Sequence, residues 1–272
     1  MTPIDLIALD LDGTLLSPDE TVSPANRVAI DRALEAGIRV VLVTGRGVDV
    51  AQRVTGELGL NLPAICCHGA LTKDFGADKT LVHIPVALEY AKPMIEFGER
   101  HGHSIAIYAE ELFWRTPGAV IHMPDMLGPG WRETPSLLDV LLRGAPTFLR
   151  FMGRPSVDAM LAEFGELPLA FRNESWFEFL ECAVLDRDAS KEHALAQLCA
   201  GFDVPADRVL AIGDSRNDVP MMRWAGIGVA MANALPEVRA AVPYVTAAND
   251  RDGVALAIER FCFTSARKRK SA

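Results

Sequence analysis

The stretch Ile7-Ala8-Leu9-Asp10-Leu11-Asp12-Gly13-Thr14-Leu15 decides the fold, because an apolar strand ends in it with two carboxylates. Side chains alternate between the faces of a strand, so residues two apart start on the same side. Asp10 and Asp12 therefore face one point if the strand continues to Asp12, and Gly13 permits a sharp turn there. Two like charges this close need a cation, a shared proton or open water. A solvated strand end followed by an Asp-Gly turn is the purely structural alternative.

The composition bounds the class of protein. The chain has 272 residues, half of them hydrophobic, and a formal net charge of -9. This length suits two domains better than one core, and the negative charge argues against binding to nucleic acid. The sequence has no apolar run of about 18 residues or more and no secretory signal at its start, so we expect a cytoplasmic protein without a membrane span. The five cysteines lack metal-ligand spacing, which indicates reduced thiols.

The first seventy residues alternate between helix and strand patterns. A helix is expected to begin at Ser23-Pro24 and to end before Gly37. The apolar run over 38–43 is too short for a helix and is typical of a strand buried on both faces of a parallel sheet. A helix over 48–58 and a short strand over 64–67 follow. This alternation predicts an α/β layout with right-handed crossovers.

The alternation breaks between about 73 and 188. There the patterns predict an α+β domain with helices over 87–101 and 156–164, a hairpin of 104–108 with 112–114, and strands over 147–152 and 176–182. A helix over 191–199 and a buried strand over 209–212 then restore the opening pattern. The predicted fold class is therefore α/β: a Rossmann-like parallel sheet core from residues 1–82 and 189–272, with an inserted α+β domain over 83–188.

Charged and polar residues follow the predicted strands of this core. In open parallel sheets, ligands bind beyond the carboxyl ends of the strands, where the strand order reverses. Oxygen ligands of this kind select Mg²⁺, which keeps several waters and binds substrate phosphate. A lysine and a hydroxyl beside the cation would hold the remaining phosphate oxygens, which leaves one carboxylate to attack phosphorus. The residues at or beside such ends are Asp10, Asp12, Thr44, Lys191, Asp214 and Asp218.

Four segments resemble the four motifs of the haloacid dehalogenase superfamily of phosphatases, in that family's order. They are Asp10-Leu-Asp-Gly-Thr14, Thr44-Gly-Arg46, Lys191 and Gly213-Asp-Ser-Arg-Asn-Asp218. The large insert between the second and third motifs resembles the C2-type cap of the Cof-like branch, which sets substrate specificity. Ala230-Met-Ala-Asn233 is also similar to that branch.

The resemblance implies a role for each acid of the motifs. Asp10 resembles the nucleophile that takes the phosphoryl group and also binds Mg²⁺. Asp12 resembles the general acid that protonates the leaving oxygen and then the base that activates water, and its backbone carbonyl would bind the metal. Asp214 resembles a metal ligand, and Asp218 resembles either a ligand or an acid that orients the others.

The resemblance also implies a phosphate-binding set. Thr44, with Gly45 beside it, and Lys191 resemble the pair that holds the phosphate. Asn217 is expected to contact phosphate or metal-bound water.

Two residues depart from the branch's usual pattern. His68-Gly69-Ala70 stands where that branch often has Asn-Gly-Ala, and Glu192 stands where it often has Gly after the motif lysine. His68 either touches substrate or fills the hinge into the cap, and we favour the hinge. Glu192 brings a negative charge near the phosphate unless its side chain points away. Both departures bear on the substrate rather than on the reaction.

We therefore expect a Mg²⁺-dependent phosphatase that hydrolyses a small phosphomonoester through an aspartyl-phosphate. The expected partner is a small phosphorylated metabolite, either a sugar phosphate or a nucleotide- or cofactor-related phosphate, with no nucleic acid and no membrane; the sequence carries no signal for an oligomeric state. A phosphomutase acting on a sugar phosphate and a non-catalytic sensor of a phosphate ligand are the alternatives. A dehalogenase is disfavoured because its chemistry has no evident use for Asp12 and the Mg²⁺ acids.

Overall fold

The computed structural model describes residues 3–117, 119, 131–176 and 179–263. The chain forms two compact units. Unit 1 comprises Met1–Gly45, Ala51–Thr80 and Ser190–Ala272, and unit 2 comprises Arg46–Val50 and Leu81–Ala189. Among the described residues, no helix has both the length and the apolar character needed to cross a membrane. That unit 2 acts as a cap stays a prediction.

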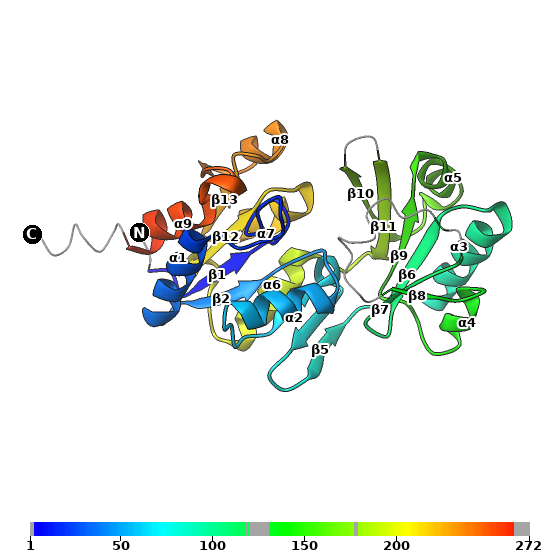
Figure 1. Ribbon diagram of the computed structural model, residues 1–272, viewed down its shortest axis with the longest axis horizontal. Coiled ribbons are helices and arrows are strands. Elements are labelled where there is room, and N and C mark those ends of the chain that lie inside the picture. The colour runs from blue at the N-terminus through cyan, green and yellow to red at the C-terminus, as the bar shows by residue number, and fades with distance from the viewer. Residues whose placement is uncertain (1–2, 118, 120–130, 177–178, 264–272) are drawn as a thin grey trace, which may run out of the picture. The chain divides into compact units, whose positions relative to one another are not determined.

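Unit 1 alternates strands and helices as the sequence predicts (Figure 1). Its strands are β1 (Leu6–Leu9), β2 (Arg39–Leu42), β3 (Ala64–Cys66), β4 (Leu71–Asp74), β12 (Val209–Gly213), β13 (Ile227–Ala230) and β14 (Tyr244–Val245). Its helices are α1 (Pro24–Glu35), α6 (Lys191–Gly201), α7 (Val219–Trp224), α8 (Pro236–Ala240) and α9 (Gly253–Ile258), with a 3-10 turn, η1 (Cys67–Gly69), after β3. Helix α2 (Val48–Glu57) begins in a segment of unit 2, and β5 (Lys79–His83) crosses from unit 1 to unit 2.

The main sheet of unit 1 has the strand order β14-β13-β12-β1-β2, and every neighbouring pair is parallel. The predicted parallel sheet core is thereby confirmed. Strand β1 lies between β2 and β12, so that Leu9 pairs with Leu42 on one side and with Ile212 on the other. Parallel strands in this register end at one edge, so the residues after β1, β2 and β12 are brought together.

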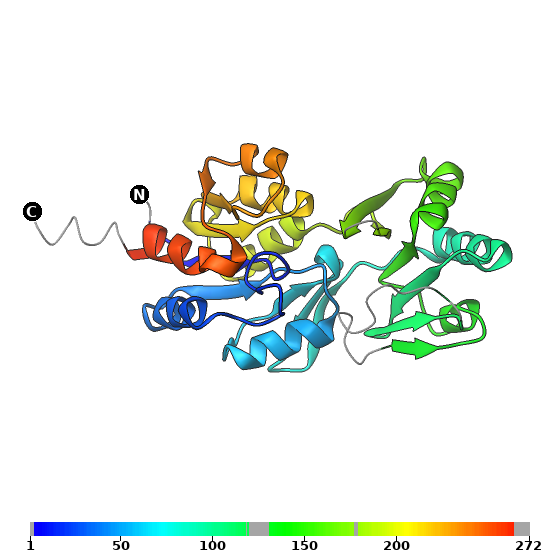
Figure 2. The same cartoon turned by 45° about the horizontal axis from the view of Figure 1, so that its top comes forward.

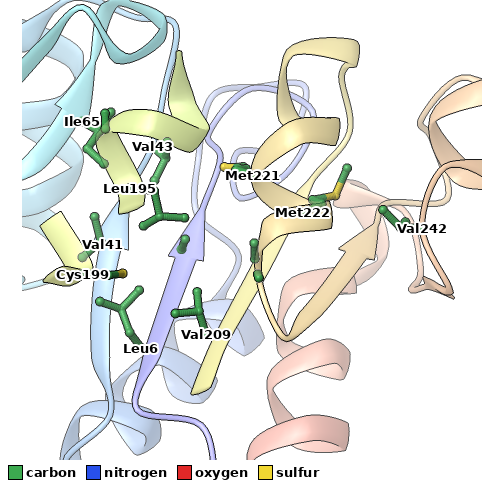
Figure 3. Close-up of a cluster of buried hydrophobic side chains, with 14 of the residues drawn as sticks. Leu6, Val41, Val43, Ile65, Leu195, Cys199, Val209, Met221, Met222 and Val242 are labelled. Carbon is green, nitrogen blue, oxygen red and sulfur yellow. The ribbon is translucent and has the colours of Figure 1, made fainter. Parts of the chain in front are cut away.

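The core of unit 1 packs against one face of this sheet. Alternate strand residues such as Leu6 and Val41 contact apolar residues of α6 and α7, among them Leu195 and Met221 (Figure 3). The alternate residues on the opposite face are buried as well. Figure 2 shows α1 and α9 side by side on that other face. Burial on both faces explains why these strands are short, continuous apolar runs in the sequence.

Helix α1 begins and ends where the sequence predicts. The Ser23 side chain accepts a hydrogen bond from the backbone N–H of Asn26 at 3.1 Å, and Pro24 occupies the first turn. The fully buried Asn26 accepts a bond from the backbone N–H of Ala255 at 2.9 Å. This polar contact fixes α1 against α9 in addition to the apolar packing.

Unit 2 is an α+β unit, as predicted, with one six-stranded sheet in the order β10-β11-β9-β6-β7-β8. Helices of unit 2 cover one face of that sheet, where a second apolar core forms (Figure 1). The elements are α3 (Leu88–His101), β6 (Ile105–Ala109), β7 (Leu112–Arg115), β8 (Trp131–Glu133), α4 (Leu138–Leu141), β9 (Phe148–Met152), α5 (Arg154–Phe164), β10 (Leu169–Trp176) and β11 (Phe179–Asp186).

The expected strand over 176–182 has the wrong bounds: its residues 179–182 lie in β11, but β11 begins at Phe179 and continues to Asp186. The structure instead has an antiparallel hairpin in which β10 ends at Trp176 and β11 begins at Phe179, with these two residues paired. No glycine, proline or asparagine marks the turn in the sequence, so alternation alone placed one strand across it. Strands β4 and β8 and helix α4 were not predicted either.

Candidate active site

The loops after β1, β2 and β12 form the candidate site. The backbone N–H of Asp10 donates to the carbonyl of Ile212 at 3.1 Å, which extends the pairing of β1 with β12 by one residue. Thr44 is fully buried two residues beyond β2, and its N–H donates to the Ile65 carbonyl at 2.8 Å. The sheet register therefore sets the first acid beside the loop that carries the later acids.

A buried lysine joins two of the predicted acids. The Nζ atom of Lys191 donates to Oδ1 of Asp10 and to Oδ1 of Asp218, each at 2.7 Å. Lys191 is the first residue of α6, and the Ser190 hydroxyl caps that helix by accepting from the N–H of His193 at 3.0 Å. The cap fixes the helix start, which aims the lysine side chain at the strand ends.

Carboxylate oxygens of Asp10, Asp214 and Asp218 lie within 4.8 Å of one another. Burial and then the charge of Asp218 raise the pKa of Asp10 well above its ordinary value, and Lys191 opposes this shift. Burial, with the charge of Asp218 next, raises the pKa of Asp214 to about 7. Burial alone would lower the pKa of Lys191, but the two acids that it bonds raise it. The lysine stays charged, and the negative charge around it exceeds its own.

This donor set fits a divalent cation. All of its atoms are carboxylate oxygens, which are the ligands that hard cations such as Mg²⁺ take. Burial first, and then the charge of Asp218, raise the pKa values of Asp10 and Asp214, and a bound cation would oppose both effects. The Asp12 side chain is half-buried and is not one of these three carboxylates, so its predicted metal contact rests on its backbone carbonyl.

Asp218 does more than join the lysine. Its Oδ2 atom accepts from the backbone N–H groups of Asp214 and Ser215 at 3.2 and 3.0 Å. Because Oδ1 holds Lys191, this fully buried side chain organises the loop after β12 and the lysine together. These contacts favour the orienting role over that of a direct metal ligand.

Two tight contacts shape the loop after β1. Gly13 has φ +72°, and a Cβ added there would lie 2.2 Å from Oδ2 of Asp214. The Asn233 side chain donates to the Gly13 carbonyl at 2.7 Å and accepts from the backbone N–H of Asn249 at 3.0 Å. A residue with a side chain at position 13 would displace Asp214, so the motif glycine serves the acid cluster itself.

The remaining predicted residues meet at His68. The Nδ2 atom of Asn217 lies 3.1 Å from Nδ1 of His68, and the His68 backbone N–H donates to the Thr44 carbonyl at 3.0 Å. A Cβ on Gly45 would lie 2.4 Å from Cε1 of the His68 ring. Glu192 is half-buried in the first turn of α6. The contact between His68 and Asn217 was not predicted, because the two residues lie 149 positions apart and no local pattern links them.

This fold and this site together define a class of protein: α/β enzymes with a cluster of acids, able to bind a cation, at the carboxyl edge of a parallel sheet. The chain belongs to the family of haloacid dehalogenase-like hydrolases, whose family model matches residues 7–258.

Named relatives and solved structures agree with this membership. The chain is 31% identical over 263 residues to the pyridoxal phosphate phosphatase YbhA of Escherichia coli, covering 92% of this chain and 96% of that protein. It is 28% identical over 267 residues to the 5-amino-6-(5-phospho-D-ribitylamino)uracil phosphatase YcsE of Bacillus subtilis, covering 95% and 96%. A haloacid dehalogenase-like hydrolase from Bacteroides thetaiotaomicron superposes with a TM-score of 0.83 and 27% identity, covering 94% of this chain and 99% of that chain.

Proposed function

We propose that this protein is a Mg²⁺-dependent phosphatase that hydrolyses small phosphomonoesters through a phosphoryl group carried on Asp10. The observation that carries the proposal is the buried cluster in which Lys191 bonds Asp10 and Asp218 at 2.7 Å with Asp214 close by. Such a cluster supplies a carboxylate nucleophile, a fixed positive charge and oxygen ligands for a cation at one point.

The first half-reaction belongs to Asp10 and Asp12. An ionised Asp10 oxygen forms a bond to phosphorus while the bond from phosphorus to the leaving oxygen breaks. Asp12 donates its proton to that oxygen, which leaves as an alcohol. Lys191 holds Oδ1 of Asp10 and so favours the ionised form that the attack needs, against the burial that raises the pKa of this acid.

The second half-reaction returns the enzyme to its starting state. Asp12, now ionised, takes a proton from a water molecule that attacks phosphorus, and the Asp10 carboxylate leaves. Asp10 and Asp214, with the backbone carbonyl of Asp12, would hold the cation. When bound, Mg²⁺ supplies positive charge that offsets the repulsion between carboxylate and phosphate. Thr44 and Lys191 would bind the phosphate oxygens.

The names of two relatives support a proposal about the class of substrate. One is a phosphatase of pyridoxal phosphate and another is a phosphatase of 5-amino-6-(5-phospho-D-ribitylamino)uracil. Both names describe phosphomonoesters of small, ring-containing molecules. We therefore place cofactor-related phosphates ahead of sugar phosphates, with the protein acting in the cytoplasm.

The direct test is Asp10→Asn, which keeps the size of the side chain and removes the nucleophilic charge. Turnover of an aryl phosphate with Mg²⁺ should fall by about 10⁴-fold or more. Asp31→Asn, an exposed acid on α1, is the matched control and should keep wild-type turnover. Wild-type turnover in Asp10→Asn would exclude Asp10 as the nucleophile.

A substrate panel separates the alternatives. The wild-type protein should release free phosphate from pyridoxal phosphate and related compounds faster than from hexose phosphates. An isomerised hexose phosphate without free phosphate would identify a mutase instead. No Mg²⁺-stimulated hydrolysis across the panel would favour a phosphate-ligand sensor.

A further inference from the structure

His68 occupies a strained and crowded position. It follows β3 in the turn η1, is buried, and has φ +56°, which lies in the left-handed region that asparagine and glycine adopt more readily. Its backbone N–H bonds the Thr44 carbonyl, its ring lies against Gly45, and its Nδ1 atom faces Asn217. One side chain thus contacts two of the loops that carry the predicted phosphate-binding residues.

Asn217 carries the second, independent observation. Its Oδ1 atom is buried and has no hydrogen-bond partner among the residues that the structure describes, while its Nδ2 atom faces His68. A buried acceptor without a donor is unfavourable, and such atoms are rare in folded proteins.

The two ends of an asparagine amide differ only in nitrogen and oxygen, so the side chain has a second orientation in the same place. If Nδ2 faces His68, then Nδ1 of His68 is an acceptor and the imidazole proton is on Nε2. If the amide is turned over, Oδ1 faces His68 and accepts from a proton on Nδ1. The second arrangement gives the amide oxygen a donor and puts the NH₂ group in the buried place, where none of the described residues accepts from it, so a ligand oxygen would have to be its acceptor.

We infer that His68 is a positioning residue that carries its proton on Nδ1 and donates it to Oδ1 of Asn217, so that the Asn217 amide presents N–H groups toward the phosphoryl site. This inference rests on the proposed function in one respect, the phosphate contact assigned to Asn217. An amide oxygen in that position would repel an anionic phosphate, whereas an N–H group attracts it. His68 thereby decides which side of the amide the substrate meets.

The tautomer of His68 tests the inference without any measurement of activity. Long-range ¹H–¹⁵N spectra of the ¹⁵N-histidine-labelled protein at pH 8 report which ring nitrogen carries the proton. His68→Asn identifies the signal among the six histidines. We expect His68 to carry its proton on Nδ1 in the wild-type protein and on Nε2 in Asn217→Ala. An Nε2–H form or an imidazolium in the wild-type protein would overturn the inference, even if the protein is an active phosphatase.

Kinetics supply a second reading. His68→Asn suits the left-handed backbone and keeps an amide donor near the Nδ1 position, so its KM should stay within about threefold of wild type. His68→Leu offers no donor, and its KM should rise on the order of tenfold with a smaller change in kcat. Equal KM values in the two variants would contradict the role. A protein with the Nδ1–H signal but no phosphatase activity would refute the proposed function and leave the tautomer assignment intact.

Discussion

Each of the two units buries a charged cluster, and the clusters differ in how their charges balance. In unit 1, the single cation of Lys191 bonds Asp10 and Asp218, and a carboxylate oxygen of Asp214 lies within 4.8 Å of oxygens of both acids. Three acids therefore surround one base. Burial and the acidic neighbours of Asp10 raise its pKa, so the ionised form of this acid is unfavourable in the folded protein.

In unit 2, Arg150 pairs with Glu181 at 3.6 Å, one cation to one acid. The guanidinium also lies over the rings of Phe113 and Phe148, at 5.5 and 5.4 Å from their centroids. This pair is neutral overall and packed by aromatic faces. The comparison teaches that a pair of one cation and one acid stabilises the fold by itself. A cluster with more acids than bases, as in unit 1, instead indicates a site for an additional cation.

The largest expected effect follows from removing the base of unit 1. Lys191→Met should lower kcat/KM by about 10²–10³-fold, because a fixed positive charge at the phosphoryl site is lost. It should also lower the free energy of unfolding by about 3–5 kcal/mol, since two buried acids lose their partner. Steady-state kinetics and urea unfolding measure the two quantities. Lys92→Met, which changes an exposed lysine on α3, is the control. If Lys191→Met and Lys92→Met were equally stable, the bonds of Lys191 to its two acids would not stabilise unit 1.

The second effect is a loss of stability in unit 2, where Arg150 pairs with Glu181. Arg150→Met should lower the free energy of unfolding by about 3 kcal/mol, because Glu181, whose side chain is 13% exposed, loses its cation. The double variant Arg150→Met with Glu181→Leu should recover much of that loss, which urea unfolding of the four proteins in the cycle measures. Strict additivity of the two substitutions would show that the pair does not interact.

The sequence predicted the acids of unit 1 better than the pair of unit 2, and the reason is physical. Strand ends are marked locally, by short apolar runs followed by Asp10, Thr44 or Asp214, and a parallel sheet brings such ends together. The Arg150–Glu181 pair depends on the antiparallel register of β9 with β11, and the sequence patterns predicted neither that pairing nor its register. Alternation cannot fix register where no turn residue marks the hairpin.

Local sequence patterns did not predict the contacts between distant loops either. His68 meets Asn217, and Asn233 meets Gly13, only after the sheet has formed. Gly13 was expected to permit a sharp turn after Asp12, but no local pattern indicated that its nearest neighbour would be the side chain of Asp214. Sequence reasoning therefore found which loops gather and left open what each side chain in them touches.

A third, smaller effect reverses the usual sign of removing an acid. In EDTA, Asp214→Asn should raise the free energy of unfolding by about 1 kcal/mol, because the folded variant no longer buries this carboxylate charge beside that of Asp218. The pKa of Asp214 is raised to about 7 from an ordinary 3.8, so the folded protein holds this proton more tightly than the unfolded chain. The stability that this proton contributes is present below about pH 3.8 and is lost as pH rises through 7.

Urea unfolding at several pH values checks this in wild type and variant. The metal-free wild-type protein should lose stability between pH 4 and 7 more steeply than Asp214→Asn. Saturating Mg²⁺ should raise the stability of the wild-type protein but not that of Asp214→Asn. Parallel pH profiles for the two proteins would mean that Asp214 carries no excess charge in unit 1.

The smallest expected effect has the opposite pH dependence and belongs to unit 2. His83 donates to or accepts from Oγ1 of Thr147 at 3.0 Å, and burial lowers its pKa below the ordinary 6.5, with Glu111 opposing the shift. The folded protein therefore binds this proton less tightly than the unfolded chain, so stability is present above about pH 6.5 and is lost as pH falls below it. The histidine is partly exposed, which limits the change to about 0.5 kcal/mol. A titration of the His83 ring protons by NMR measures the pKa directly, with His83→Gln identifying the signal. A value at or above 6.5 would mean that burial does not outweigh the charge of Glu111, and it would contradict the predicted loss of stability at low pH.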